Sequence, residues 1–512
     1  MAIDDIFKEM PADKRRSVIR CIMAEGMVSR ASEAISNSVF LISLALWLGA
    51  SNSLIGLLGA IPFLSNIFQL VGVVVVQRLH DRRLIVLVSG FVGRMFLILV
   101  VIAPFFAHEK FAIWLVILGI ALRYSMGAIS ACAFNSWSRD LIPMRSLGKF
   151  HGRRLTFFII VAAAVGAIGA EIMERWPAEL VENTGFTSYS FLFLIAMFLG
   201  VISMILIRKI PHPDLAEDEK NNYKNSFDRH VFVKPFLNKH YRNLLFSLGS
   251  WNFAINIATP FFSVYMLSYL GYDTRIVVFM NICSQISNMF FLRIWGKMAD
   301  QIGHNRILQI AAPLFVMCLL GWVLLSALSK NYDVRAYLLL LHIVMGCATA
   351  GMLLGSTTLS FALAPDKSAT SFLAMYSIVS SLFSGMAPLF GGYFSEFLQH
   401  NLHHSSFAFA GFKANEFGFW SVFFAASFLF AFIAMCFVMR LGEAEENSQK
   451  RLIQREIVSD AGKILRTISS IAGLREIIMT PMSLAIGLAK NKRHSFPQRE
   501  KLRKDCAYEA GK

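Results

Sequence analysis

A polar stretch in the middle of the chain, KIPHPDLAEDEKNNYKNSF at residues 209–227, decides the fold. It opens the segment 209–241, which is too hydrophilic to enter a bilayer. Hydropathy and turn signals give six apolar segments on each side of it. The twelve expected spans are 18–48, 53–77, 84–105, 111–134, 155–172, 187–207, 243–270, 274–299, 307–328, 335–363, 369–398 and 417–440. The sequence therefore predicts an all-α integral membrane protein with two six-helix bundles.

The composition excludes several classes of protein. Of the 512 residues, 56% are hydrophobic and 16% are charged, whereas soluble proteins have about 45–50% and about 25%. A soluble enzyme and a disordered chain are both excluded, and a membrane β-barrel is disfavoured because its strands alternate in hydropathy. The net charge of +16 resides in loops and tails, which indicates membrane orientation and lipid contact rather than nucleic-acid binding.

Lysine and arginine placement predicts the topology. The loops after spans two and four and the central loop are basic, and the outer loops hold few cations. Both termini are then cytoplasmic, as an even number of spans requires, and we expect the protein in a plasma or inner membrane. The expected parts are a cytoplasmic N-terminus (1–17), a first bundle (18–208), a central cytoplasmic loop (209–241), a second bundle (242–441) and a basic tail with an amphipathic helix (442–512).

An internal repeat supports two equivalent halves. The loop after span four reads SRDLIPMRS (138–146), and the loop after span ten reads SFALAPDKS (360–368). Serine, leucine, proline, a cation and serine recur 222 residues apart. Asp81 after span two and Asp300 after span eight form a second echo. Both echoes fall at equivalent points of a scheme in which six spans are followed by six more.

The segment GKMADQIGHNR (296–306) resembles the signature loop of the major facilitator superfamily. Gly296, Asp300 and Gly303 match its pattern, and Arg306 supplies a cation one residue late. The resemblance extends over roughly residues 18–441 and implies a transporter fold. Asp300 near the helix ends can pair with Arg306, which makes this loop a candidate gate. The alternative is a static tight turn.

Two further elements carry the resemblance. The copy after span two keeps Asp81, but Gln77 replaces its glycine. In span four, Arg123 and Gly127 resemble the family's R-x-x-x-G element. Span five lacks the G-P pair of the family's antiporters, which weakens an exporter assignment.

Charges inside the expected spans are the candidate coupling residues. Glu25, Arg30 and Glu33 fit on one side of span one, within about 140° of arc. Arg30 and Glu33 are three residues apart and can pair. One interpretation is a protonatable site at Glu33, tuned by Arg30. The alternative is a structural pair, with Glu25 at headgroup level.

Arg123 lies near the middle of span four and cannot easily reach water. It therefore needs a carboxylate, carbonyl groups or an anionic ligand, and Glu33 is the carboxylate that we expect. A purely structural ion pair is the alternative. In the second half, Asn252 and Asn256 in span seven and Asn281 and Gln285 in span eight lie at helical spacing. They either line a wet cavity or hydrogen-bond neighbouring helices.

The sequence thus predicts a secondary transporter, not an enzyme. It would move a small solute by alternating access around a site between the halves, with proton coupling as a hypothesis. A cationic cavity favours anionic or zwitterionic solutes, provided that no protein carboxylate neutralises Arg123. A lipid-handling protein or a non-transporting sensor on the same fold is the alternative. No phosphate-binding loop, metal motif or cysteine framework is present, so we expect no cofactor and no metal. We expect a monomer whose partners are the solute, protons and membrane lipids.

Overall fold

The protein is described from a computed structural model. The structure describes residues 12–36, 39–79, 81–106, 110–141, 144–210, 229–329, 332–365, 369–404, 408–409, 412–413 and 418–446. The chain divides into one compact unit at Met1–Gly442 and another at Glu443–Lys512. Most of the expected central loop and the expected amphipathic helix of the tail lie outside the described residues. Everything below concerns the first unit.

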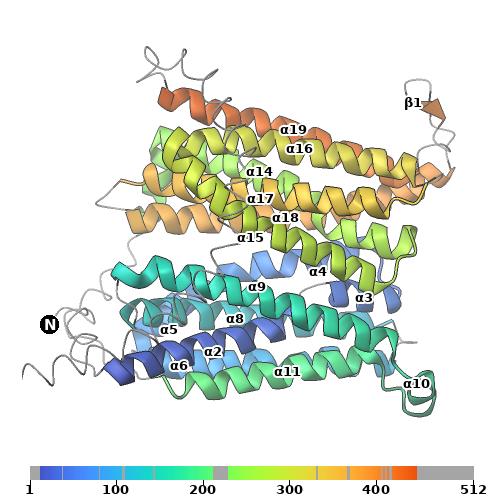
Figure 1. Cartoon of the computed structure of the whole chain (residues 1–512), viewed down its shortest axis with the longest axis horizontal. Coiled ribbons are helices and arrows are strands. Elements are labelled where there is room, and N and C mark those ends of the chain that lie inside the picture. Colours follow the sequence, from blue (N-terminus) through green and yellow to red (C-terminus); the bar gives the residue numbers. More distant parts are fainter. Residues whose placement is uncertain are drawn as a thin grey trace, which may run out of the picture. The chain divides into compact units, whose positions relative to one another are not determined.

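The first bundle follows the order of the expected spans (Figure 1). Spans two and three are each divided by a short 3₁₀ turn or a break in the helix. The helices are α2 (Ala12–Ser36), α3 (Val39–Trp47), α4 (Asn52–Leu64), η1 (Ser65–Ile67), α5 (Phe68–Leu79), α6 (Arg82–Met95), α7 (Leu97–Ile102), η2 (Ala103–Phe106), α8 (Ala112–Leu141), α9 (Met144–Glu174), α10 (Ala178–Thr184) and α11 (Ser188–Ile207).

The second bundle has longer, less divided helices. Its elements are α13 (Arg229–Leu237), α14 (Lys239–Val264), the π-helical turn η3 (Tyr265–Tyr269), α15 (Thr274–Ile302), α16 (His304–Leu328), α17 (Arg335–Ala362), α18 (Ala369–His404) and α19 (Phe419–Glu446). A short antiparallel ladder, β1 (Ala408–Phe409) with β2 (Phe412–Lys413), lies between α18 and α19. The fold is otherwise helical, as predicted.

Ten helices in the described ranges are long and apolar enough to cross a membrane. Their bounds follow the expected spans closely; the span expected at 274–299 is the helix segment Thr274–Ala299. The other two expected spans are formed by α2 with α3 and by α14. Charged residues in α2 and amides in α14 lower the hydropathy of these helices. Their membrane crossing, and with it the count of twelve, stays a prediction.

Local sequence explains where several helices begin and bend. Asp81 caps α6 by accepting a hydrogen bond from the Leu84 backbone N–H at 2.9 Å. Gly303 joins α15 to α16 with a φ of 89°, a conformation that favours glycine. Pro62 in α4 and Pro260 in α14 each remove a helix hydrogen bond. The π-helical turn η3 continues α14 a few residues after Pro260.

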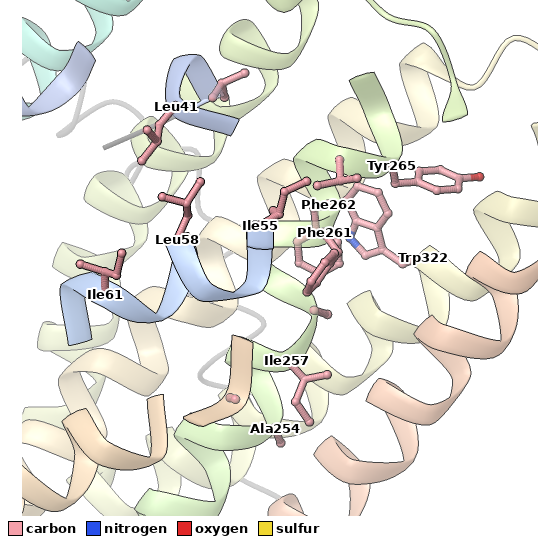
Figure 2. Packing of buried hydrophobic residues seen from close by; sticks show 14 of the residues in the cluster. Leu41, Ile55, Leu58, Ile61, Ala254, Ile257, Phe261, Phe262, Tyr265 and Trp322 are labelled. Atoms are coloured by element: carbon pink, nitrogen blue, oxygen red, sulfur yellow. The ribbon is translucent and has the colours of Figure 1, made fainter. Parts of the chain in front are cut away.

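A hydrophobic cluster joins the two bundles (Figure 2). Ile55 and Leu58 of α4 belong to the same buried cluster as Phe261 of α14. Next to them Phe262 stacks on Trp322, with ring centroids 4.3 Å apart. Lipid tails are as apolar as these side chains, so close van der Waals packing, rather than escape from water, favours this contact in a membrane.

Small residues of α4 and α18 allow a close approach of the two bundles. A Cβ at Gly56 would lie 2.2 Å from the backbone oxygen of Pro388 and 3.0 Å from the Cα of Gly392. At Gly392 it would lie 2.7 Å from the backbone oxygen of Asn52. Asn52 also donates from Nδ2 to Ser395 Oγ at 3.0 Å. Glycine is therefore required at this contact, because any side chain would push the bundles apart.

Candidate functional site

The first bundle contains a cavity of about 410 Å³, the N-bundle cavity, which is open on one side. Every residue that lines it lies between positions 25 and 207. Its walls are unusually rich in charge for the interior of a helical bundle. The polar side chains considered below are Glu25, Ser29, Glu33, Arg94, Arg123, Tyr124 and Arg154.

A second cavity of about 350 Å³, the inter-bundle cavity, lies between the bundles. Its walls come from α2, α3, α4 and α9 on one side and from α14, α15 and α18 on the other. The polar side chains that line it include Arg30, Glu33, Asn256, Thr259, Asn281 and Gln285. Glu33 and Pro62 line both cavities. Glu33 therefore lies at their junction.

The charges of span one are divided between the two cavities. Arg30 Nη1 and Glu33 Oε2 form an ion pair at 3.1 Å, as their spacing predicts. Glu25 lines the N-bundle cavity, is only 5% exposed and accepts a hydrogen bond from Ser203 Oγ at 3.2 Å. The expected alternative for Glu25, a position among lipid headgroups, does not fit this buried contact.

Arg123 reaches the N-bundle cavity but does not form the expected ion pair with Glu33. The described carboxylate–cation contact of Glu33 is the one with Arg30. The guanidinium of Arg123 lies over the ring of Tyr124, 5.0 Å from its centroid. Its Nε is buried and has no hydrogen-bond partner in the described part of the chain. The sequence could not settle the pairing, because Arg30 competes for Glu33 from one turn away.

Sequence reasoning missed two further arginines of this cavity. Arg94, in the span expected at 84–105, donates to Gly90 O, Ser29 Oγ and Ser203 Oγ at 2.9, 3.2 and 3.1 Å. Arg154 falls in the basic loop expected after span four, just before the span expected at 155–172. Helix α9 begins at Met144 instead, which places Arg154 inside the bundle. The signal was present in the i, i+4 spacing to Phe158, whose ring lies 4.9 Å from the guanidinium.

The amides of the second half have two different roles. Asn256, Asn281 and Gln285 line the inter-bundle cavity, the wet-cavity alternative of the sequence analysis. Asn252 lines neither described cavity, and its backbone oxygen accepts a hydrogen bond from Asn256 Nδ2 at 2.7 Å. Asn281 Nδ2 donates to Val277 O at 2.9 Å. Part of the hydrogen-bonding capacity of these amide side chains is therefore already used within their own helices.

Only part of the candidate gating loop lies among the described residues. Gly296 lies within α15, and Gly303 forms the turn to α16. Arg306 lies in the first turn of α16. The side chain of Asp300 lies outside the described residues. Asp81, its expected counterpart, caps α6. Among the described residues, no group of three histidine, cysteine or acidic side chains is arranged to hold a metal ion.

Comparison with known proteins identifies the family. The model described as Major Facilitator Superfamily matches residues 26–388. The chain belongs to the major facilitator superfamily. The resemblance of the 296–306 loop is thereby confirmed, and the fold and family of this superfamily member are those of transporters rather than enzymes. A search of curated proteins found no match.

Three solved structures with the same fold are distant from this chain in sequence. The nucleoside transporter NupG is 14% identical, with a TM-score of 0.58 over 82% of this chain and 98% of that one. A bacterial homologue of the human lysosomal transporter Spinster, inward-facing and unoccupied, is 14% identical, with a TM-score of 0.60 over 85% and 98%. The xylose transporter XylE from E. coli, in an inward-open conformation, is 13% identical, with a TM-score of 0.56 over 82% and 96%. The likeness concerns the fold alone.

Proposed function

We propose that this superfamily member is a secondary active transporter that moves a small solute by alternating access. The observation that carries the proposal is the inter-bundle cavity, whose polar side chains come from both bundles. A site built in this way changes its exposure when one bundle rocks against the other. Asn256, Asn281 and Gln285 offer hydrogen bonds from one side, and Arg30 and Glu33 offer charge from the other.

Contacts between the bundles support a state that is closed at one end. At the end that carries α10, Arg275 of α15 pairs with Glu171 and Glu174 of α9 at 3.6 and 3.2 Å. The glycine contact of α4 with α18 lies towards the same end, because α4 starts there. The basic loops predict that this end faces outwards. The conformation is then inward-facing.

We infer that Glu33 is the coupling carboxylate, since it lies at the junction of the two cavities and beside Arg30. The expected result is that Glu33→Gln abolishes the pH dependence of solute uptake by the reconstituted protein. Glu182→Gln is the matched control, because Glu182 is exposed on α10. An unchanged pH profile in Glu33→Gln would contradict coupling through this residue.

The solute for this assay must first be found. Thermal-shift screening of the purified chain against amino acids, sugars, nucleosides and organic anions gives candidates, and flux into proteoliposomes with an imposed proton gradient then tests transport. Transport is refuted if no binding solute crosses the membrane faster than in protein-free vesicles.

A second candidate function, lipid handling, is favoured by one observation. An apolar crevice of about 140 Å³ lies between span two and α18, lined by Phe63, Ile67 and Leu382 among others. Asn66 lines both this crevice and the N-bundle cavity. A fluorescent lysophospholipid supplied in one leaflet should then move to the other in proteoliposomes. A solute transporter without lipid activity would leave it in place.

A further inference from the structure

We propose that the N-bundle cavity is an oxyanion-binding site, and that it receives the anionic group of the transported solute. The substrate class is then an organic anion that carries a carboxylate or phosphate. The assignment of this anion to a transported solute rests on the proposed function. The proposal that an oxyanion binds in the cavity stands independently of that function.

An excess of positive charge in the cavity is the first argument for this proposal. Arg94, Arg123 and Arg154 all line it, and the carboxylates that line it are Glu25 and Glu33. Glu33 is already paired with Arg30. Three guanidiniums therefore face one remaining carboxylate, which leaves about two positive charges inside a membrane helix bundle. Uncompensated charge at this depth is costly, so an anionic occupant is strongly favoured.

The arrangement of the hydrogen-bond donors of the three arginines is the second argument. Arg94 is committed to three protein oxygens. Arg123 and Arg154 are held instead by aromatic rings, those of Tyr124 and Phe158. Their Nε atoms are buried and have no hydrogen-bond partner in the ranges that the structure describes. A buried donor without a partner costs free energy, so these two N–H groups favour a ligand that accepts hydrogen bonds. A guanidinium that rests on a ring keeps N–H groups for the planar edge of a carboxylate or phosphate.

The size of the cavity and its position beside the inter-bundle cavity are the third argument. Its volume of about 410 Å³ falls in the range of small-molecule sites. The cavity meets the inter-bundle cavity at Glu33 and Pro62. One solute can therefore place its oxyanion among the arginines and its uncharged part between the bundles, where amide side chains line the wall. The solute then spans the junction of the two cavities, beside the proposed coupling carboxylate Glu33.

The test measures the unfolding temperature of the purified full-length chain in detergent. Sodium phosphate, sodium succinate and dihexanoyl phosphatidic acid are titrated separately at constant ionic strength. At least one should raise the midpoint in a saturable manner. A response to phosphate or succinate indicates a free anion, and a response to phosphatidic acid alone indicates a lipid headgroup. Either response supports the oxyanion-binding site.

Matched variants locate the effect. Arg154→Gln should raise the half-saturating concentration by about tenfold, the loss expected for one charged hydrogen-bond partner. Arg153→Gln removes the same charge from an exposed neighbour and should leave it unchanged. If Arg154→Gln does not fold, Arg154→Lys keeps the charge without the planar fork and should weaken binding by a smaller factor. The proposal is overturned if no oxyanion stabilises the chain, or if Arg153→Gln weakens binding as much as Arg154→Gln. Flux of a neutral solute without oxyanion binding would overturn this proposal and leave the transporter intact.

Discussion

Gly56 sets how closely the two bundles approach, because its missing side chain admits the backbone of α18. In Gly56→Ala the new Cβ would lie 2.2 Å from the Pro388 oxygen, so α4 and α18 must separate. We expect a loss of about 1–3 kcal/mol, typical of overpacking, measured by thermal or denaturant unfolding. Gly166→Ala is the control, since its Cβ would meet Val278 Cγ1 at an ordinary 3.4 Å. Equal losses in both variants would show that the α4 contact is not special.

At the residue scale, the sequence could identify charges but not their partners. Glu33 and Arg123 stood out because a charge in an apolar window is visible without a structure, and both line the N-bundle cavity. Arg154 was missed because helix α9 starts eleven residues before the span expected at 155–172. The partner of Arg123 depends on which helix faces are opposed. Hydropathy carries no information on that point.

At the scale of helices, the ion pairs of Arg275 join α9 to α15 at the closed end. The three side chains are 40–44% exposed, so Arg275→Gln should cost only about 0–1 kcal/mol of stability. It removes contacts that exist in one conformation alone, and the population of the other conformation should therefore rise. Spin labels at Leu180→Cys and Tyr332→Cys, in a chain without its native cysteines, should report a longer distance.

Arg175→Gln provides the control for this experiment. Arg175 also contacts Glu171, but it lies directly after α9 on the same bundle, so its loss leaves the contact between bundles in place. Arg175→Gln should keep the original label distance. A distance change of the same size in both variants would mean that the charge of the outer loop, and not the bridge, sets the conformation.

Helix bounds were more predictable than helix pairing. Long apolar runs end at loops, so ten expected spans match described helices within a few residues. The division of span two into α4, η1 and α5 was not foreseen, although Pro62 lies just before it. Proline in a helix indicates a bend, but the tertiary contacts decide whether a 3₁₀ turn follows.

At the scale of the molecule, two helix pairs hold the closed end, α4 with α18 and α9 with α15. The sequence repeat predicts that span two corresponds to span eight and span five to span eleven, which makes these two pairs equivalent. Their chemistry differs, however. The first pair uses glycine, proline and a hydrogen bond from Asn52 to Ser395, and the second uses ion pairs. Each pair can therefore be perturbed without the other.

This separation permits a direct test of alternating access. In the double variant Asn52→Cys with Ser395→Cys, the new thiols stand in for side chains that contact each other, with Nδ2 and Oγ 3.0 Å apart, so oxidation should cross-link α4 to α18. Because rocking must part these helices, the oxidised protein should lose solute flux and regain it on reduction. The single variants, which cannot cross-link, should keep flux under oxidant. A cross-linked protein that still transports would refute alternating access through this end, since the solute would then cross while the bundles stayed joined.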